Sequence, residues 1–410
     1  MTQTLISNGT LIDGRGGEPL PGASVLVENE KIIAVAAAGE ALQVELDAEQ
    51  IDAGGGTILP GFFDAHVHVM LQIGKLEAEL AEPFSLRFFK AAGHMRQTLE
   101  AGITAVRDAG GADLGLKQAW EQGLVAGPRL QISTTVLGIT GGHFDGWHPS
   151  GNSLSYFNGY PGMPDGICDG VPEVRKKVRE VLRAGADVVK ICATGGVLSP
   201  TDHPEFTQFS PAELQAIVQE AAYRRDIKVM AHAQGAEGIK QAVRAGIHSI
   251  EHGIFLDDET IDLMLEKGTF LVPTLLAPVA VLEIGEEGGM PEYGLNKARE
   301  IIDVHRESIR RAHEAGVKIA LGTDAGVMPH GTNLRELPLL VGAGLTPMEA
   351  IVAGTQTGAQ CLGWDELLGT VEPGKLADII ISSQDPLSDI SSLADNENIW
   401  MVMQDGKRVK

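Results

Sequence analysis

Cysteine is scarce in this sequence: Cys168, Cys192 and Cys361 are the three present among 410 residues. Three widely separated cysteines provide neither a disulfide framework nor a Cys-x-x-Cys zinc motif. The chain also lacks an apolar run of the roughly 18–20 residues that a membrane-spanning helix requires. Its first residues lack the basic and apolar segments of a signal peptide. We therefore expect a protein of the reducing cytoplasm with no membrane partner.

Basic residues are in the minority. The sequence has 32 lysines and arginines against 55 aspartates and glutamates, a formal net charge of −23, and its basic residues form no cluster. Nucleic acids and anionic membrane surfaces bind concentrated positive charge. The composition therefore argues against both as partners.

Strand and helix patterns alternate from about residue 57 to residue 355. The strand patterns cover residues 57–69, 104–107, 129–135, 187–191, 228–233, 249–251, 270–274 and 317–322. The helix patterns cover residues 77–101, 113–122, 171–184, 211–225, 236–245, 258–267 and 296–315. This alternation predicts an α/β fold with a parallel sheet, and eight strands predict a closed (β/α)8 TIM-like barrel. A doubly wound sheet is the alternative, but no Gly-x-Gly-x-x-Gly follows the first strand, which disfavours dinucleotide binding.

Both ends of the chain have short strand patterns separated by turns. An Asn-Gly turn divides two apolar segments near the N-terminus, and further strand patterns cover residues 376–382, 399–403 and 406–409. We expect residues 1–56 and 361–410 to form one small β-sandwich domain. Residues 57–360 would then form the barrel.

The first barrel strand ends in two histidines, His66 and His68. Side chains alternate along a strand, so both imidazoles lie on the same face. Two imidazoles on one face can chelate a metal ion, although a pair of hydrogen-bonded core histidines would show the same spacing.

Four further polar residues occupy the ends of later strands: Lys190, His232, His252 and Asp324. Taken singly, each histidine is more often a core residue, Asp324 fits a turn, and a lysine can extend to the surface. However, active sites of barrels lie at the carboxyl ends of the strands, where these groups converge. Together with His66 and His68 they predict a metal site.

The chain resembles the amidohydrolase superfamily in the order of these six groups and over nearly its whole length. The segments Pro60-Gly-Phe-Phe-Asp-Ala-His-Val-His and Val371-Glu-Pro-Gly-Lys-Leu-Ala-Asp are both similar to signatures of that superfamily. Within it, the chain is most similar to the Xaa-Pro dipeptidase and arginine carboxypeptidase-like group, also called imidazolonepropionase-like. That narrower match is carried by Val189-Lys-Ile-Cys-Ala-Thr-Gly-Gly, Ala231-His-Ala and Ile250-Glu-His-Gly.

This resemblance implies two divalent metal ions, usually zinc. His66, His68 and Asp324 would hold one ion, and His232 and His252 the other. Lys190 would bridge the ions as a carbamate, N6-carboxylysine. Imidazolonepropionase is expected to lack this lysine, so Lys190 weighs against that activity.

The resemblance also implies hydrolysis of an amide bond. A hydroxide between two cations is nucleophilic at neutral pH, and Asp324 can carry its proton to the leaving nitrogen. We expect a dipeptide or an N-acyl amino acid with a free carboxylate as substrate. Cyclic amides or imides, lactones and exogenous amides are the alternatives, as is a barrel that has lost catalysis and serves as a scaffold. Relatives of this kind are often homo-oligomers.

Substrate contacts are expected in the loops that follow the strands. The longest loop, residues 136–170, contains His143, which matches a position near the substrate in the family; packing against Trp147 is the alternative. Gln234 follows His232 on the same face, where some dipeptidase relatives have a tyrosine. His330 is a third candidate for lining the pocket.

Overall fold

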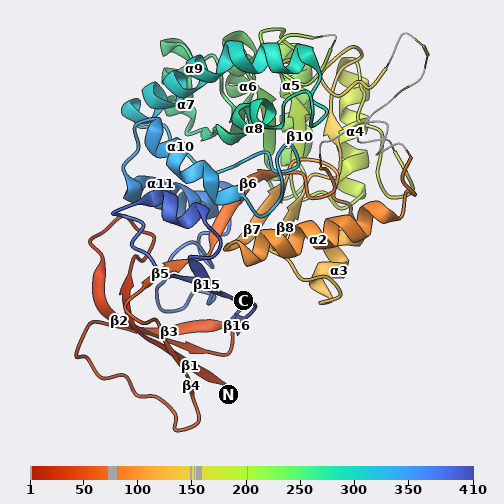
Figure 1. The fold of residues 1–410 in the computed structure, drawn as a ribbon. Coiled ribbons are helices and arrows are strands. Elements are labelled where there is room, and N and C mark those ends of the chain that lie inside the picture. The colour runs from red at the N-terminus through yellow and green to blue at the C-terminus, as the bar shows by residue number, and fades with distance from the viewer. Residues whose placement is uncertain (1, 73–80, 148–149, 152, 154–158, 201) are drawn as a thin grey trace.

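The computed structural model describes residues 2–72, 81–147, 150–151, 153, 159–200 and 202–410. Two lobes are visible in Figure 1: one built from strands of both chain ends, and a larger one in which helices surround the remaining strands. Both termini lie in the smaller lobe. In the described part of the chain, no helix has the length and apolarity to cross a bilayer.

The smaller lobe is one continuous sheet of eight strands, in the order β16-β15-β14-β5-β1-β2-β3, with β4 paired to β1. Its strands are β1 Gln3–Leu11, β2 Leu20–Glu28, β3 Lys31–Ala36, β4 Glu49–Asp52, β5 Thr57–Pro60, β14 Ile379–Ser382, β15 Ile399–Gln404 and β16 Lys407–Arg408. The two chain ends do share a lobe. Their strands form one hydrogen-bonded sheet, because β5 pairs with β14 on one side and β1 on the other.

The predicted first strand, 57–69, is divided into two strands at Gly61. β5 belongs to the terminal sheet, whereas β6 (Phe62–Val67) pairs with β7 in the larger lobe. A β-carbon on Gly61 would lie 2.3 Å from the Thr104 hydroxyl oxygen, so only glycine allows this close approach. The chain therefore changes sheets here, four residues later than the expected boundary at residue 57.

The larger lobe contains the predicted ring of parallel strands. They are β6, β7 (Ile103–Asp108), β8 (Arg129–Ile132), β9 (Val136–Leu137), β10 (Val189–Cys192), β11 (Val229–Ala233), β12 (Ser249–His252) and β13 (Phe270–Val272). β8 and β9 are one interrupted strand: β8 pairs with β7, and β9 pairs with β10.

Residues 317–325 close the ring between β13 and β6. Parallel bridges join Leu271 to Ile319 and Val67 to Ala325, and the Ala65 amide donates to the Leu321 carbonyl at 2.8 Å. The predicted eighth strand is thus present as an irregular segment. The result is an eight-membered barrel whose carboxyl ends face one side.

The predicted helices pack around this ring (Figure 1). They are α2 Leu86–Glu100, α3 Leu114–Glu121, α4 Gly170–Arg183, α5 Pro211–Ala222, α6 Ala236–Ala245, α7 Asp258–Lys267 and α9 Glu292–Ala315. The expected start of α2 at 77 falls among residues 73–80, outside the described residues. Helices α8 Leu276–Ile284, α10 Glu336–Gly342, α11 Pro347–Gly354 and α12 Gln356–Leu362 were not predicted. All four are short, and α8, α10 and α11 are mostly apolar, so their helical period is weak.

Candidate metal centre and active site

One cavity of about 240 Å³ opens at the carboxyl ends of the barrel strands. All six predicted metal-ligating residues line it: His66, His68, Lys190, His232, His252 and Asp324. These residues are spread over 259 positions of the chain, and the barrel brings them together because parallel strands end on the same side.

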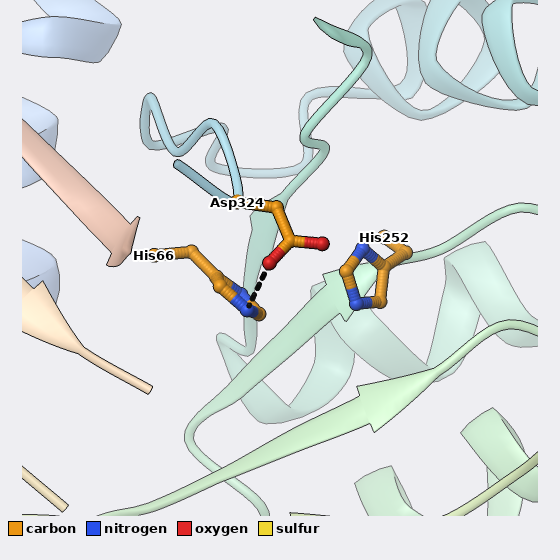
Figure 2. Close-up of side chains that lie close together, drawn as sticks. All are labelled: His66, His252 and Asp324. Carbon is orange, nitrogen blue, oxygen red and sulfur yellow. Dashed lines mark ion pairs between the residues drawn. The ribbon is translucent and has the colours of Figure 1, made fainter. Parts of the chain in front are cut away.

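Asp324 lies at the centre of this group. Its Oδ1 is 3.5 Å from the Nε2 of His66 and 3.3 Å from the Nε2 of His68. Figure 2 shows the Asp324 carboxylate between the rings of His66 and His252, and ligand atoms of these three residues all lie within 4.8 Å of one another. The spacing is suited to a shared metal ion.

The histidines at the end of β6 and directly after it, His66 and His68, are each held from outside the cavity. His66 Nδ1 is 2.8 Å from Glu251 Oε2, and His68 Nδ1 is 2.8 Å from the Gly110 carbonyl. The Asp108 carboxylate accepts hydrogen bonds from the amides of Val69 and Gly110 and so holds the turn that carries this carbonyl. An acceptor on Nδ1 keeps the proton there and directs the Nε2 lone pair inward.

The other two histidines are held in the same manner. His232 Nε2 is 3.0 Å from the Gly195 carbonyl, and His252 Nδ1 is 2.7 Å from the Thr274 hydroxyl. Their rings are 4.6 Å apart, and the His252 ring is 5.1 Å from that of His66. In each of the four imidazoles, one ring nitrogen therefore makes a hydrogen bond behind the cavity, and this contact sets the orientation of the other nitrogen.

Behind His66 lies a buried ion pair that the sequence analysis did not identify. Arg107 is 1% exposed and Glu251 is 0% exposed. Arg107 donates to Glu251 Oε1 at 3.0 Å, and the Ser249 hydroxyl donates to the same oxygen at 2.6 Å. An arginine within an apolar strand was the available signal, since a buried charge requires a partner.

Lys190 is the least satisfied polar group in the cavity. It is 1% exposed, and its Nζ has no hydrogen-bond partner among the described residues. Burial lowers its pKa from the ordinary value. The amine is therefore driven toward its neutral form.

Three of the four histidines and Asp324 have protonation states that suit cation binding. The exception is His68: burial lowers its pKa, but its hydrogen bond with Asp324 raises it overall. Burial holds the pKa values of His66, His232 and His252 well below the usual range, so their imidazoles are neutral. Burial alone would raise the pKa of Asp324, but its hydrogen bond with His68 lowers it overall, so the carboxylate is ionised. Neutral imidazoles and a carboxylate are the donor set of a zinc-type site.

Two of the six residues have unusual backbone geometry. His252 has φ = 76° and Asp324 has φ = 64°, and Thr274, which contacts His252, has φ = 53°. Residues other than glycine seldom adopt this left-handed region, and it persists where the surrounding structure enforces it. Here the strain turns side chains at strand ends into the cavity.

The predicted substrate contacts divide into two groups. His143 and Gln234 line the cavity, and Gln234 Oε1 is buried without a hydrogen-bond partner in the described structure. His143 stacks on His232, with ring centres 4.3 Å apart. His330 is not among the lining residues: its Nε2 contacts the Leu71 carbonyl at 2.9 Å and its ring stacks on His94.

A sequence profile of the amidohydrolase family matches residues 57–409. The chain belongs to the amidohydrolase family. This confirms the resemblance inferred from the strand-end residues, and it makes the protein a hydrolase that acts on amide bonds.

Several individual amidohydrolases are similar to the chain. The Aspergillus niger protein named ochratoxinase is 35% identical over 420 aligned residues, covering 99% of this chain and 86% of that protein. A crystal structure described as a Xaa-Pro dipeptidase with methionine bound in the active site superposes with a TM-score of 0.89, at 35% identity and full coverage of both chains. A prolidase complexed with N-methylphosphonate-L-proline superposes with a TM-score of 0.91, at 36% identity and full coverage of both chains.

Proposed function

We propose that this amidohydrolase is a binuclear metal enzyme that cleaves the amide bond of a dipeptide or an N-acyl amino acid. Relatives named Xaa-Pro dipeptidase and prolidase, with methionine or a proline derivative bound, support a substrate of this class. The observation that carries the proposal is the buried Nζ of Lys190, which has no hydrogen-bond partner in the described part of the chain and lies among histidines and an aspartate.

Lys190 would complete the site as a carbamate. Its neutral amine can add to carbon dioxide, which forms an N–C bond and releases one proton. The product is an anion with two oxygens in place of a neutral amine. Those oxygens would help to balance the charge of two cations, because a neutral imidazole ligand contributes no negative charge.

The ligands divide between the two ions by position. His66, His68 and Asp324 would hold one ion, since His68 and Asp324 are in contact and His66 adjoins both. His232 and His252 would hold the other, with carboxylated Lys190 between the two ions. The cluster of His66, His252 and Asp324 spans both sets.

When bound, the ions supply Lewis acidity to the scissile carbonyl and lower the pKa of water. Asp324 accepts the proton of the attacking water and passes it to the leaving nitrogen, so that its carboxylate is restored. Gln234 offers a buried amide oxygen that has no hydrogen-bond partner in the described structure, and we propose that it contacts a polar group of the substrate. His143 would contact the substrate carbonyl or carboxylate.

The outer part of the cavity is apolar. Its lining includes Val197, Leu198, Ile254, Pro278, Val281 and Ile301. No arginine is among the described lining residues, and Lys190 is their only lysine. An apolar side chain on the substrate therefore fits the wall, and imidazole and amide groups remain for its carboxylate.

The proposal is tested by metal content and substrate screening together. Protein prepared with zinc and bicarbonate should hold about two ions per chain and hydrolyse apolar dipeptides or N-acyl amino acids. If the protein hydrolyses only cyclic imides or lactones, these compounds replace dipeptides and N-acyl amino acids as the substrate class. If the protein binds no metal and hydrolyses none of these compounds, the alternative of a scaffold without catalysis is favoured.

Lys190 has its own test. After incubation with 13C-bicarbonate, the protein should show a carbamate carbon resonance that is absent from Lys190→Gln. The exposed lysine variant Lys228→Gln serves as the matched control and should retain the resonance. An unchanged spectrum in Lys190→Gln would remove the carbamate from the proposal.

A further inference from the structure

We propose that Asp202 and Lys297 are positioning residues that hold the imidazole of His143 over the cavity through Ser199. This inference rests on the proposed function, because it concerns how one substrate contact is held. The groups come from separate parts of the fold: His143 from the loop after β9, Ser199 and Asp202 from the loop after β10, and Lys297 from α9.

Ser199 and Asp202 engage one ring nitrogen of His143. His143 Nδ1 is 2.8 Å from the Ser199 hydroxyl oxygen and 3.4 Å from Asp202 Oδ2. The Ser199 hydroxyl donates to Asp202 Oδ1. A hydroxyl that donates to a carboxylate accepts from its other neighbour, so the proton of His143 is directed to Nδ1. Nε2 then becomes the atom that meets the substrate.

Lys297 fixes the loop that carries these two groups. Its Nζ donates to the carbonyls of Gly196, Ser199 and Asp202 at 2.9, 2.8 and 2.7 Å. An ammonium group has three donors, and all three are used on this one loop. Ser199 and Asp202 are 6% and 8% exposed, so the contacts are shielded from water.

Gly196 shows how closely the loop fits the ring. A β-carbon at this position would lie 2.2 Å from Cε1 of His143. The ring also stacks on His232, with ring centres 4.3 Å apart. The imidazole is thus confined between the loop and a predicted metal ligand, and its edge contacts decide its orientation.

A double-mutant cycle tests the inference. Asp202→Asn should lower kcat/KM by roughly 10- to 100-fold when His143 is present, and by less than about 2-fold in a His143→Ala background, because coupled residues are non-additive. Lys297→Gln should behave alike, and Asp202→Glu should recover part of the loss. Metal content should stay unchanged in all of them. Asp226→Asn, at an exposed aspartate, and Arg306→Gln, on the same helix as Lys297, are the matched controls.

Additive losses in the two backgrounds would overturn the inference, since a purely structural Asp202 acts with or without His143. If the wild-type protein hydrolyses none of the substrates, the proposed function fails. The inference is then tested by the position of the His143 ring alone. Crystal structures of Asp202→Asn and Gly196→Ala should then show a displaced His143, whereas Gly93→Ala, in open space on α2, should not. A ring unmoved in both variants would refute it.

Discussion

At the scale of single residues, each histidine of the cavity depends on the group behind it. His66 contacts Glu251, His68 a backbone carbonyl and His252 the Thr274 hydroxyl. Glu251 differs from the other two because it also neutralises a buried arginine. Removal of its charge would affect both the orientation of His66 and the pairing of Arg107.

Glu251→Gln should weaken metal binding by roughly 10- to 100-fold, as is typical when a partner behind a metal-binding histidine is lost. The measurement is competition with a chelator, with circular dichroism to confirm folding. Ser249→Ala, which keeps the ion pair and removes the two hydrogen bonds that the hydroxyl makes with Glu251 and Arg107, should have a smaller effect. The exposed Glu259→Gln is the control, and an affinity in Glu251→Gln equal to this control would contradict the role.

Asp324→Asn should lower kcat by several orders of magnitude while the fold is retained. Asparagine cannot accept the proton that the mechanism assigns to this carboxylate, and it is a weaker ligand. Turnover is to be compared at equal metal content, so that loss of the ion and loss of the base are separated. Turnover near that of the wild type would remove Asp324 from the proton transfer.

At the scale of elements, the ends of α8 and α10 are joined by one buried carboxyl. Glu336, at the start of α10, accepts hydrogen bonds from the amides of Leu275 and Leu276, both at 2.7 Å. These amides begin α8, beside Thr274 and its contact with His252. A buried group that links the two helices therefore also supports the cavity wall.

The stability of the protein should fall as pH rises through this titration. Burial raises the pKa of Glu336 from 4.5 to about 8. The folded chain holds the proton more tightly than the unfolded chain, so this contribution is complete below pH 4.5 and is lost as pH approaches 8. Urea unfolding should show the loss, on the order of a few kcal/mol, and Glu336→Gln should flatten it. Exposed Glu300→Gln should keep the slope of the wild type, and an equal slope in Glu336→Gln would refute the assignment.

At the scale of the whole molecule, the cavity is assembled by the closed ring, and the ring is attached to the terminal sheet. Gly61 carries the chain from β5 to β6. Across the lobes, Arg129 contacts Asp405 at 2.8 Å and Gln404 donates to the Thr104 carbonyl at 2.9 Å. Metal ligands on several strands would therefore couple ion binding to the stability of the whole barrel.

Removal of metal should abolish hydrolysis and lower the melting temperature. An ion that binds the folded chain alone stabilises it by about 2.7 kcal/mol when its free concentration is 100 times its Kd. Calorimetry of protein dialysed against a chelator, and then reloaded with zinc, measures the shift and its reversal. Equal melting temperatures and equal activity in both forms would exclude a metal enzyme.

The sequence predicted most of the regular elements because their local signals are strong. Ser210 and Glu213 form a capping box at the start of α5, and Gly246 and Gly316 end α6 and α9 at φ = 94° and 93°. The division of 57–69 at Gly61 was missed, since pairing with a distant strand decides it. His330 was predicted to line the cavity; it is not among the lining residues and contacts the carbonyl of Leu71, which is one of them.

By itself, then, the sequence determined the α/β class, the family and the set of side chains at the strand ends, because strand periodicity dictates which residues share a face. The tertiary structure alone decided which groups stand behind that set. Glu251 meets His66 across 185 positions, and Lys297 reaches Gly196 across 101. Contacts of such separation depend on strand order and loop geometry, which no local pattern encodes.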